Sequence, residues 1–140
     1  MMAKKVMILP CSGIGKPAGE IGRQAAYEVV RTLRPNQTGI TCLARLMIDD
    51  EETINLVRSN YVITLDGCPD DCARKNVERV RNNVDGSVHV ADLLEEHPEL
   101  HPSGILRIGE DGMRLVELLA GQLAEQVDQL TAEEDGNGGN

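Results

Sequence analysis

Short apolar runs alternate with amphipathic segments through the first two thirds of the chain. Four of the short runs are typical of buried strands: residues 5–9, 39–42, 62–65 and 87–91. Between them, apolar residues recur every three or four positions, which is the spacing of one helix face. Strands that alternate with helices indicate βαβ units, so we expect a three-layer α/β/α sandwich with a mostly parallel, Rossmann-like sheet of four or five strands.

Four further segments complete the predicted organisation. Residues 43–48 fit either a strand continuation or a helical turn, and 105–108 fit a fifth extended piece. An amphipathic helix over about 112–130 carries one apolar stripe. Residues 131–140 are rich in Glu, Asp, Gly and Asn. We therefore expect a single domain over 1–130, followed by a disordered, acidic and glycine-rich tail.

Proline and short polar side chains indicate where the helices begin. Pro17 suits the first helical position after the first strand, where its missing N–H costs nothing. Asp49, with Glu52 three positions later, has the spacing of a capping box. After the third strand, Cys68 falls at an N-cap position and Pro69 at the first helical position. We therefore expect a helix to begin at Cys68.

Composition and charge narrow the function classes. Of the 140 residues, 41% are apolar, which is enough for one core, and the net charge is -9. This acidity disfavours nucleic-acid binding, because phosphate contacts need clustered Lys and Arg. No apolar run reaches the ~7–15 residues of a signal-peptide core or the ~20 residues of a membrane span. We expect a cytoplasmic protein with reduced thiols.

The four cysteines carry the strongest chemical signal. Cys11, Cys42 and Cys68 each follow a predicted strand, and Cys72 comes one helical turn after Cys68. Because parallel strands end at one edge of a sheet, the four thiols should meet at the edge where open α/β sheets bind ligands. In a reducing compartment this pattern favours a metal site over a structural disulfide. Four cysteines match a closed zinc site with no open position.

Charged residues near the cysteines bear on this interpretation. Four thiolates around Zn²⁺ leave a net charge of about -2, which requires nearby cations. Four basic residues follow a cysteine closely and could supply them: Lys16, Arg45, Arg74 and Lys75. Asp70 and Asp71 fit first-turn acids that complement a helix dipole. Asp66 and Gly67 would shape the turn that aims Cys68, with Gly67 supplying a backbone conformation that other residues resist.

Other functions stay open for the same residues. Cys68 and Cys72 suit a thiol–disulfide oxidoreductase in which Cys68 attacks and Cys72 resolves. An iron–sulfur cluster takes the same number of cysteine ligands as this zinc site. Some thiols could instead be buried packing residues. A module that docks a partner through the last helix is a further class. The sequence does not decide whether the protein is an enzyme, or whether its partner is a small molecule or a protein.

The glycine-rich segment 13–18 suggests three more activities, and each lacks a required residue. It fits the dinucleotide fingerprint G-x-G-x-x-A, but Cys42 replaces the acidic residue expected after the second strand. A phosphate P-loop is excluded because Pro10 and Pro17 take the places of its first Gly and its Ser or Thr. Cys11 could attack a phosphate, but Pro17 stands where an arginine should clamp it.

The three histidines are weak candidates for chemistry. His89 alternates within a predicted strand and fits a satisfied core or surface residue, while His97 and His101 flank prolines in a loop. The sequence shows no local Ser-His-Asp or Cys-His arrangement.

Three short motifs together resemble the DGC-domain family. They are Leu-Pro-Cys-Ser-Gly at 9–13, Cys-Leu-Ala-Arg-Leu at 42–46, and Asp-Gly-Cys-Pro-Asp-Asp-Cys-Ala at 66–73. The resemblance covers about residues 5–110 and includes the Asp-Gly-Cys triplet that gives the family its name. It implies that all four cysteines bind zinc, and it implies no particular reaction or substrate.

Overall fold

The strands form one parallel sheet. The computed structural model describes residues 4–11, 16–67, 70–105 and 107–138. Within these residues, four strands pair in the order β2-β1-β3-β4: β1 (Val6–Pro10), β2 (Thr38–Ile40), β3 (Tyr61–Asp66) and β4 (Gly86–His89). Every neighbouring pair is parallel. The predicted α/β fold is confirmed.

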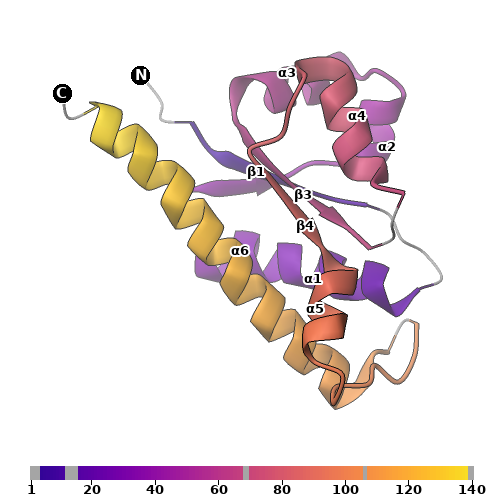
Figure 1. Cartoon of the computed structure of the whole chain (residues 1–140). Coiled ribbons are helices and arrows are strands. Elements are labelled where there is room, and N and C mark those ends of the chain that lie inside the picture. Colours follow the sequence, from indigo (N-terminus) through magenta and orange to yellow (C-terminus); the bar gives the residue numbers. More distant parts are fainter. Residues whose placement is uncertain (1–3, 12–15, 68–69, 106, 139–140) are drawn as a thin grey trace.

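Helices cover both faces of the sheet (Figure 1). One face is covered by α1, its π-helical continuation η1, α5 and α6, which span Pro17–Glu28, Val29–Leu33, Val90–Glu96 and Gly109–Gly138. The other face is covered by α2, α3 and α4, which span Leu43–Met47, Glu51–Ser59 and Cys72–Arg81. The sheet and its two helical layers make up the predicted three-layer sandwich.

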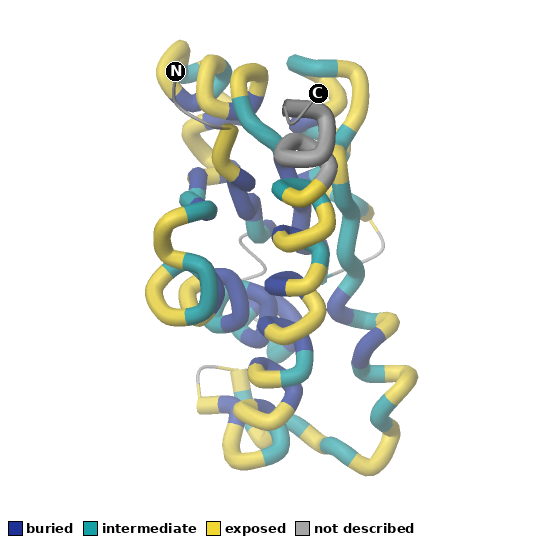
Figure 2. The backbone as a smooth tube through the Cα atoms, turned by 90° about the vertical axis from the view of Figure 1, so that its left-hand side faces the viewer, coloured by how far each residue is buried: buried dark blue, intermediate teal, exposed yellow. Residues whose placement is uncertain are grey.

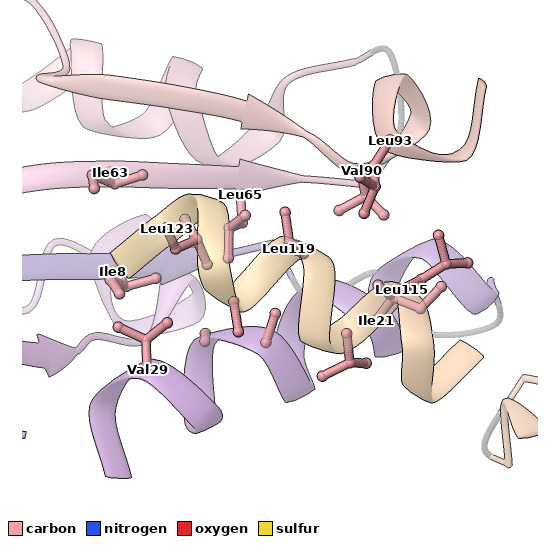
Figure 3. Close-up of a cluster of buried hydrophobic side chains, with 14 of the residues drawn as sticks. Ile8, Ile21, Val29, Ile63, Leu65, Val90, Leu93, Leu115, Leu119 and Leu123 are labelled. Atoms are coloured by element: carbon pink, nitrogen blue, oxygen red, sulfur yellow. The ribbon is translucent and has the colours of Figure 1, made fainter. Parts of the chain in front are cut away.

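The strands bury apolar side chains toward both helical layers. In β1, Val6 and Ile8 belong to the core with α1, α5 and α6, whereas Met7 and Leu9 belong to the core with α2, α3 and α4. This alternation is the two-residue period of a strand, and apolar residues on both faces are typical of a buried parallel strand. Figure 3 shows Ile8 of the first core among aliphatic side chains from the helices. Burying one such side chain contributes about 1.5–3 kcal/mol.

α6 has one buried side and one exposed side. Figure 2 shows buried positions repeating along one side of this helix. They include residues spaced four apart: Leu115, Leu119, Leu123 and Val127. The helix spans Gly109–Gly138 and is therefore longer than the predicted 112–130. The division into a domain over 1–130 and a tail over 131–140 stays a prediction. No helix in the described part of the chain combines the length and the apolar character needed to cross a membrane.

Two boundaries after the second and fourth strands differ from the predicted ones. The ambiguous segment 43–48 contains α2, so it is mainly helical. The strand predicted to run to residue 91 ends at His89, and α5 begins at Val90. The chain turns helical here because Val90 and Leu93, three positions apart, can then both enter the core on one helix face.

The fifth strand predicted over 105–108 is not formed by the described residues of that segment, 105, 107 and 108. The backbone N–H of Ser103 donates to the carbonyl of Ile108 at 3.0 Å. The segment therefore folds back on itself and does not pair with the sheet, while the Ile108 side chain is buried against the helices.

The N-cap of α3 lies one residue beyond the predicted one. The carboxylate of Asp50 accepts the backbone N–H of Thr53 at 3.0 Å, so Asp50 is the cap. Asp49 has a left-handed backbone, with φ at 60°, and its carboxylate accepts from Arg79 at 2.6 Å. The predicted capping box of Asp49 and Glu52 is therefore wrong.

Candidate functional site

The carboxyl ends of the strands meet at one edge of the sheet, on the right of Figure 1. The register places Pro10 beside Leu65, and the backbone N–H of Cys11 extends this ladder by donating to the Leu65 carbonyl at 2.8 Å. On the other side of β3, Asp66 lies beside His89. The residues that follow β1 and β2 and those that close β3 and β4 therefore share the edge that the sequence predicted.

Cys11 and Cys42 line one cavity on the β1–β2 side of this edge. The cavity has a volume of about 250 Å³, and its walls come from the ends of β1 and β2, from α1 and from the start of α2. We call it the thiol cavity. Cys11 is 7% exposed, whereas Cys42 is exposed and forms the N-cap of α2. The fold thus brings two thiols that are distant in the sequence to one wall.

Cys11 accepts a hydrogen bond that suits a thiolate. The backbone N–H of Gly67 donates to Cys11 Sγ at 3.2 Å, and a donor to sulfur favours its charged form. Gly67 was expected to supply a backbone conformation that other residues resist, but its φ is not positive, so this expectation is wrong. A Cβ atom there would lie 3.2 Å from the backbone nitrogen of Gly19. Glycine suits position 67 because a Cβ atom there would crowd the backbone of the first turn of α1.

Arg23 places a positive charge on the wall of the thiol cavity. Its guanidinium pairs with Glu20 one turn earlier on α1, and this bond, with a second from Gln24, lowers the pKa of Glu20 below its usual value. Arg45, one of the cations expected near the cysteines, instead pairs with Asp50 at 3.2 Å and points to solvent. The cavity therefore draws its cation from α1.

The start of α4 differs from the prediction. The helix begins at Cys72, and its N-cap is Asp71, whose φ of 54° is left-handed. The expectation that Cys68 is the N-cap and Pro69 the first helical residue is wrong. Cys68 itself lies outside the described residues. Cys72 is exposed. The two cysteines therefore do not share the first turn of α4, which removes that geometric argument for a redox pair.

Asp66 holds the first turn of α4. Its side chain is completely buried, and its carboxylate accepts the backbone N–H groups of Ala73 at 2.9 Å and Arg74 at 3.3 Å. Burial raises the pKa of Asp66 above its usual value, and the two backbone donors act against that rise. The nearby Asp71 raises the pKa further, whereas His89 lowers it. The last residue of β3 therefore does the capping that was expected of Cys68.

Asp71 joins α4 to β4 through its side chain. One carboxylate oxygen bonds to Nε2 of His89, and the other accepts from the guanidinium of Arg74 at 2.9 Å. The expectation that Asp71 is a first-turn acid is wrong, because it precedes the helix and makes no capping bond with its side chain. His89 is satisfied by this contact, as the sequence suggested.

The described residues hold no preformed metal site: no three of their His, Cys, Asp or Glu side chains gather as ligands. Cys11 and Cys42 share the thiol cavity, and Cys72 is not among the residues that line it. Because Cys68 lies outside the described residues, the four-cysteine site stays a prediction. Gly13 and Gly15 of the glycine-rich segment lie outside them as well, while Lys16 precedes α1 as its N-cap.

Sequence reasoning missed two features of this edge. The first is the capping role of Asp66, which could have been suspected because a carboxylate that closes an apolar strand needs buried donors. The second is the contact between Asp71 and His89, for which the sequence holds no signal, because it depends on the register of β3 and β4.

The fold and this edge define a parallel α/β protein that carries thiols beyond the carboxyl ends of its strands. The DGC domain matches residues 7–105, so the chain belongs to the DGC-domain family. No curated protein and no solved structure matches the chain. Membership of this family supports a metal-binding role.

Proposed function

We propose that the protein binds one zinc ion through Cys11, Cys42, Cys68 and Cys72. The observation that carries the proposal is the convergence of Cys11 and Cys42 on the thiol cavity at the carboxyl edge of the sheet. Thiolates are the ligands of closed structural zinc sites, and zinc needs no redox partner there. When bound, zinc would cross-link the segments that follow the carboxyl ends of the strands.

The chemistry of the donor set supports the same ion. Cys11 receives a backbone N–H on its sulfur, and Cys72 is the first residue of α4, where backbone N–H groups and the helix dipole favour a thiolate. Arg23 on the cavity wall could offset part of the charge of about -2 that four thiolates leave around Zn²⁺. We further propose a cytoplasmic location, because reducing conditions keep these thiols available.

Elemental analysis of natively purified protein tests the proposal. We expect about one zinc per chain in the wild type and loss of that zinc in Cys11→Ser, Cys42→Ser, Cys68→Ser and Cys72→Ser. Met47→Leu is the matched control, because it removes a thioether sulfur from an exposed side chain five positions after Cys42, and thioethers are not among the usual ligands of zinc in proteins. This control should keep its zinc.

Two results would contradict zinc binding. Metal-free wild-type protein with a reversible disulfide between Cys68 and Cys72 would favour the oxidoreductase. Iron and sulfide in equal amounts, with visible absorption, would favour a cluster at the same cysteines. Full zinc retention in any one of the cysteine variants would exclude that residue as a ligand.

A further inference from the structure

Cys11 and Cys42 follow neighbouring strands at nearly the same height. The strands β1 and β2 pair with Ile8 beside Ile40. The backbone N–H of Thr41 continues this pairing beyond β2, because it donates to the carbonyl of Ile8 at 3.2 Å. The register therefore places Cys42 one position before the residue that lies opposite Cys11.

This offset brings the two Cα atoms within the reach of a disulfide. Cys42 keeps an extended backbone, with φ at -94° and ψ at 121°, and Cys11 still pairs with β3 through its backbone N–H. With strands about 4.8 Å apart and a rise of about 3.3 Å per residue, an offset of one position gives a Cα–Cα distance of about 6 Å. Disulfides span Cα–Cα distances of about 4.4–6.8 Å.

The thiol cavity gives a small oxidant access to this pair. Both cysteines line it, and its volume of about 250 Å³ is several times the ~30 Å³ that one water occupies in the liquid. Cys42 is exposed, whereas Cys11 is 7% exposed and accepts the backbone N–H of Gly67 on its sulfur. Cys42 is therefore the first target of an oxidant, and Cys11 lies beside it as the second thiol.

We propose that Cys11 and Cys42 form a disulfide when the reduced protein meets a hydroperoxide. The Cys42 thiolate attacks one peroxide oxygen, the O–O bond breaks, and an alcohol or water leaves a sulfenic acid on Cys42. The Cys11 thiolate then attacks the Cys42 sulfur, the S–S bond forms, and the departing hydroxide takes up a proton to become water. Two thiols are oxidised and one peroxide is reduced.

The disulfide would regulate metal binding, and this consequence alone rests on the proposed function. It uses two of the four sulfur atoms that are proposed to hold zinc, so the oxidised protein should release the metal. A dithiol reductant would restore both thiols by exchange. Formation of the disulfide itself needs no metal.

Peptide mapping tests the proposal on the full chain. Protein stripped of metal and then freed of chelator is treated with one equivalent of hydrogen peroxide and digested without reductant. Trypsin separates the thiols: Cys11 falls in peptide 6–23, Cys42 in peptide 32–45, and the other two cysteines together in peptide 59–74. We expect the first disulfide to join 6–23 to 32–45 and to disappear after reduction.

The same protein unfolded in urea is the matched control. Strand pairing is lost there, and a short loop closes at a lower entropic cost than a long one. Cys68 and Cys72 are four residues apart, so the first disulfide in urea should lie inside peptide 59–74. A change of pairing between the folded and the unfolded chain would show that the register of β1 and β2 selects the pair.

Two variants test the order of the steps. Cys42→Ser removes the exposed thiol, so oxidation of the nearly buried Cys11 should slow at least about tenfold. Cys11→Ser removes the second thiol, so a sulfenic acid should accumulate on Cys42, where dimedone traps it. Met47→Leu removes another exposed sulfur near Cys42 in sequence and should form the disulfide like the wild type.

The proposal is overturned if the folded protein does not link 6–23 to 32–45, if its first disulfide lies inside 59–74, or if Cys11 is oxidised as fast in Cys42→Ser as in the wild type. The comparison of folded with unfolded chain uses wild-type protein, so a variant that fails to fold does not affect it.

Zinc content is measured on the same samples before and after oxidation. A disulfide between Cys11 and Cys42 in protein that never contained zinc would contradict the proposed function alone. Zinc-containing protein that forms no such disulfide after the metal is stripped would contradict this inference alone. Zinc that stays bound while the disulfide forms would refute the regulation.

Discussion

The two halves of the carboxyl edge are built from different chemistry. On the β1–β2 side, the thiol cavity is lined by apolar side chains, two cysteines, Thr41 and Arg23, which pairs with Glu20. On the β3–β4 side, Asp66, Asp71, His89 and Arg74 bond to one another or to the backbone of α4. The β1–β2 half carries two of the four proposed zinc ligands. The carboxylates and His89 of the β3–β4 half hold the fold around the start of α4, where Cys72, a third proposed ligand, lies.

In the protein without zinc, this difference separates thiols that are proposed to bind the metal from carboxylates that stabilise the fold. Removing Cys42, the exposed cysteine on the β1–β2 side, should change what the protein binds and leave the apolar core intact, whereas Cys11 is part of that core. Removing a carboxylate on the β3–β4 side should leave buried N–H groups without acceptors and therefore cost folding free energy.

Removal of the proposed zinc should have the largest effect, because the ion would join the two halves. A ligand that binds the folded state alone stabilises it by about 4 kcal/mol when its free concentration is a thousand times its dissociation constant. We expect a chelator to lower the free energy of unfolding by about that amount under such conditions. Urea unfolding with and without chelator measures the change.

The matched variant for this experiment is Cys42→Ser on the β1–β2 side. Without one of its ligands the site should lose zinc, so the unfolding of this variant should no longer respond to the chelator. A wild-type protein whose urea midpoint does not move with chelator would show that zinc does not join the two halves.

Asp66→Ala should have the next largest effect. The change leaves the backbone N–H groups of Ala73 and Arg74 without their acceptor at the start of α4. Each buried donor without a partner costs about 1–3 kcal/mol, so we expect a loss of about 3 kcal/mol in the free energy of unfolding. Asp92→Ala, which removes an exposed acid in the first turn of α5, is the control and should stay within about 0.5 kcal/mol. Equal losses in both variants would refute the capping role of Asp66.

His89→Asn should have a smaller effect on stability and none on zinc. It removes the bond to Asp71, which keeps its contact with Arg74, so we expect a loss of about 1 kcal/mol. His101→Asn, at an exposed loop position, should change the free energy of unfolding by less than about 0.5 kcal/mol. Zinc content is the sharper readout, because loss of zinc in His89→Asn would mean that the contact between Asp71 and His89 is needed to place Cys72 in the metal site.

The sequence predicted the fold well because the signals that determine it are local and repeated. Apolar strands alternate with amphipathic helices, and Pro17 marks the start of α1 as expected. The edge where Cys11 and Cys42 meet followed from the rule that parallel strands end together. These inferences need no knowledge of individual side-chain contacts.

The details of the β3–β4 half could not be predicted in the same way. The sequence predicted a helix from Cys68, but Asp70 and Asp71 still precede α4, which begins at Cys72. No local pattern indicates how far the loop after β3 extends. The cap comes from Asp66, which is separated from the helix in sequence and close to it in space. Contacts of this kind depend on how β3, β4 and α4 pack, so sequence spacing alone assigned the cap to Cys68.

The pH dependence of Asp66→Asn should give the smallest effect. Burial raises the pKa of Asp66 in the folded state, because it penalises the charged carboxylate. The wild type therefore loses stability as the pH rises above the unfolded pKa of about 4 and through the higher pKa of the folded state. An amide carries no such penalty. The stability lost in Asp66→Asn should therefore be greatest at low pH and shrink toward neutral pH. We expect a small change, because the N–H groups of Ala73 and Arg74 oppose the effect of burial.

Urea unfolding of the wild type and of Asp66→Asn, both treated with chelator, measures this change across the same pH range. If the difference in the free energy of unfolding between the wild type and Asp66→Asn instead grows as the pH rises, the backbone donors outweigh burial and stabilise Asp66 in its charged form.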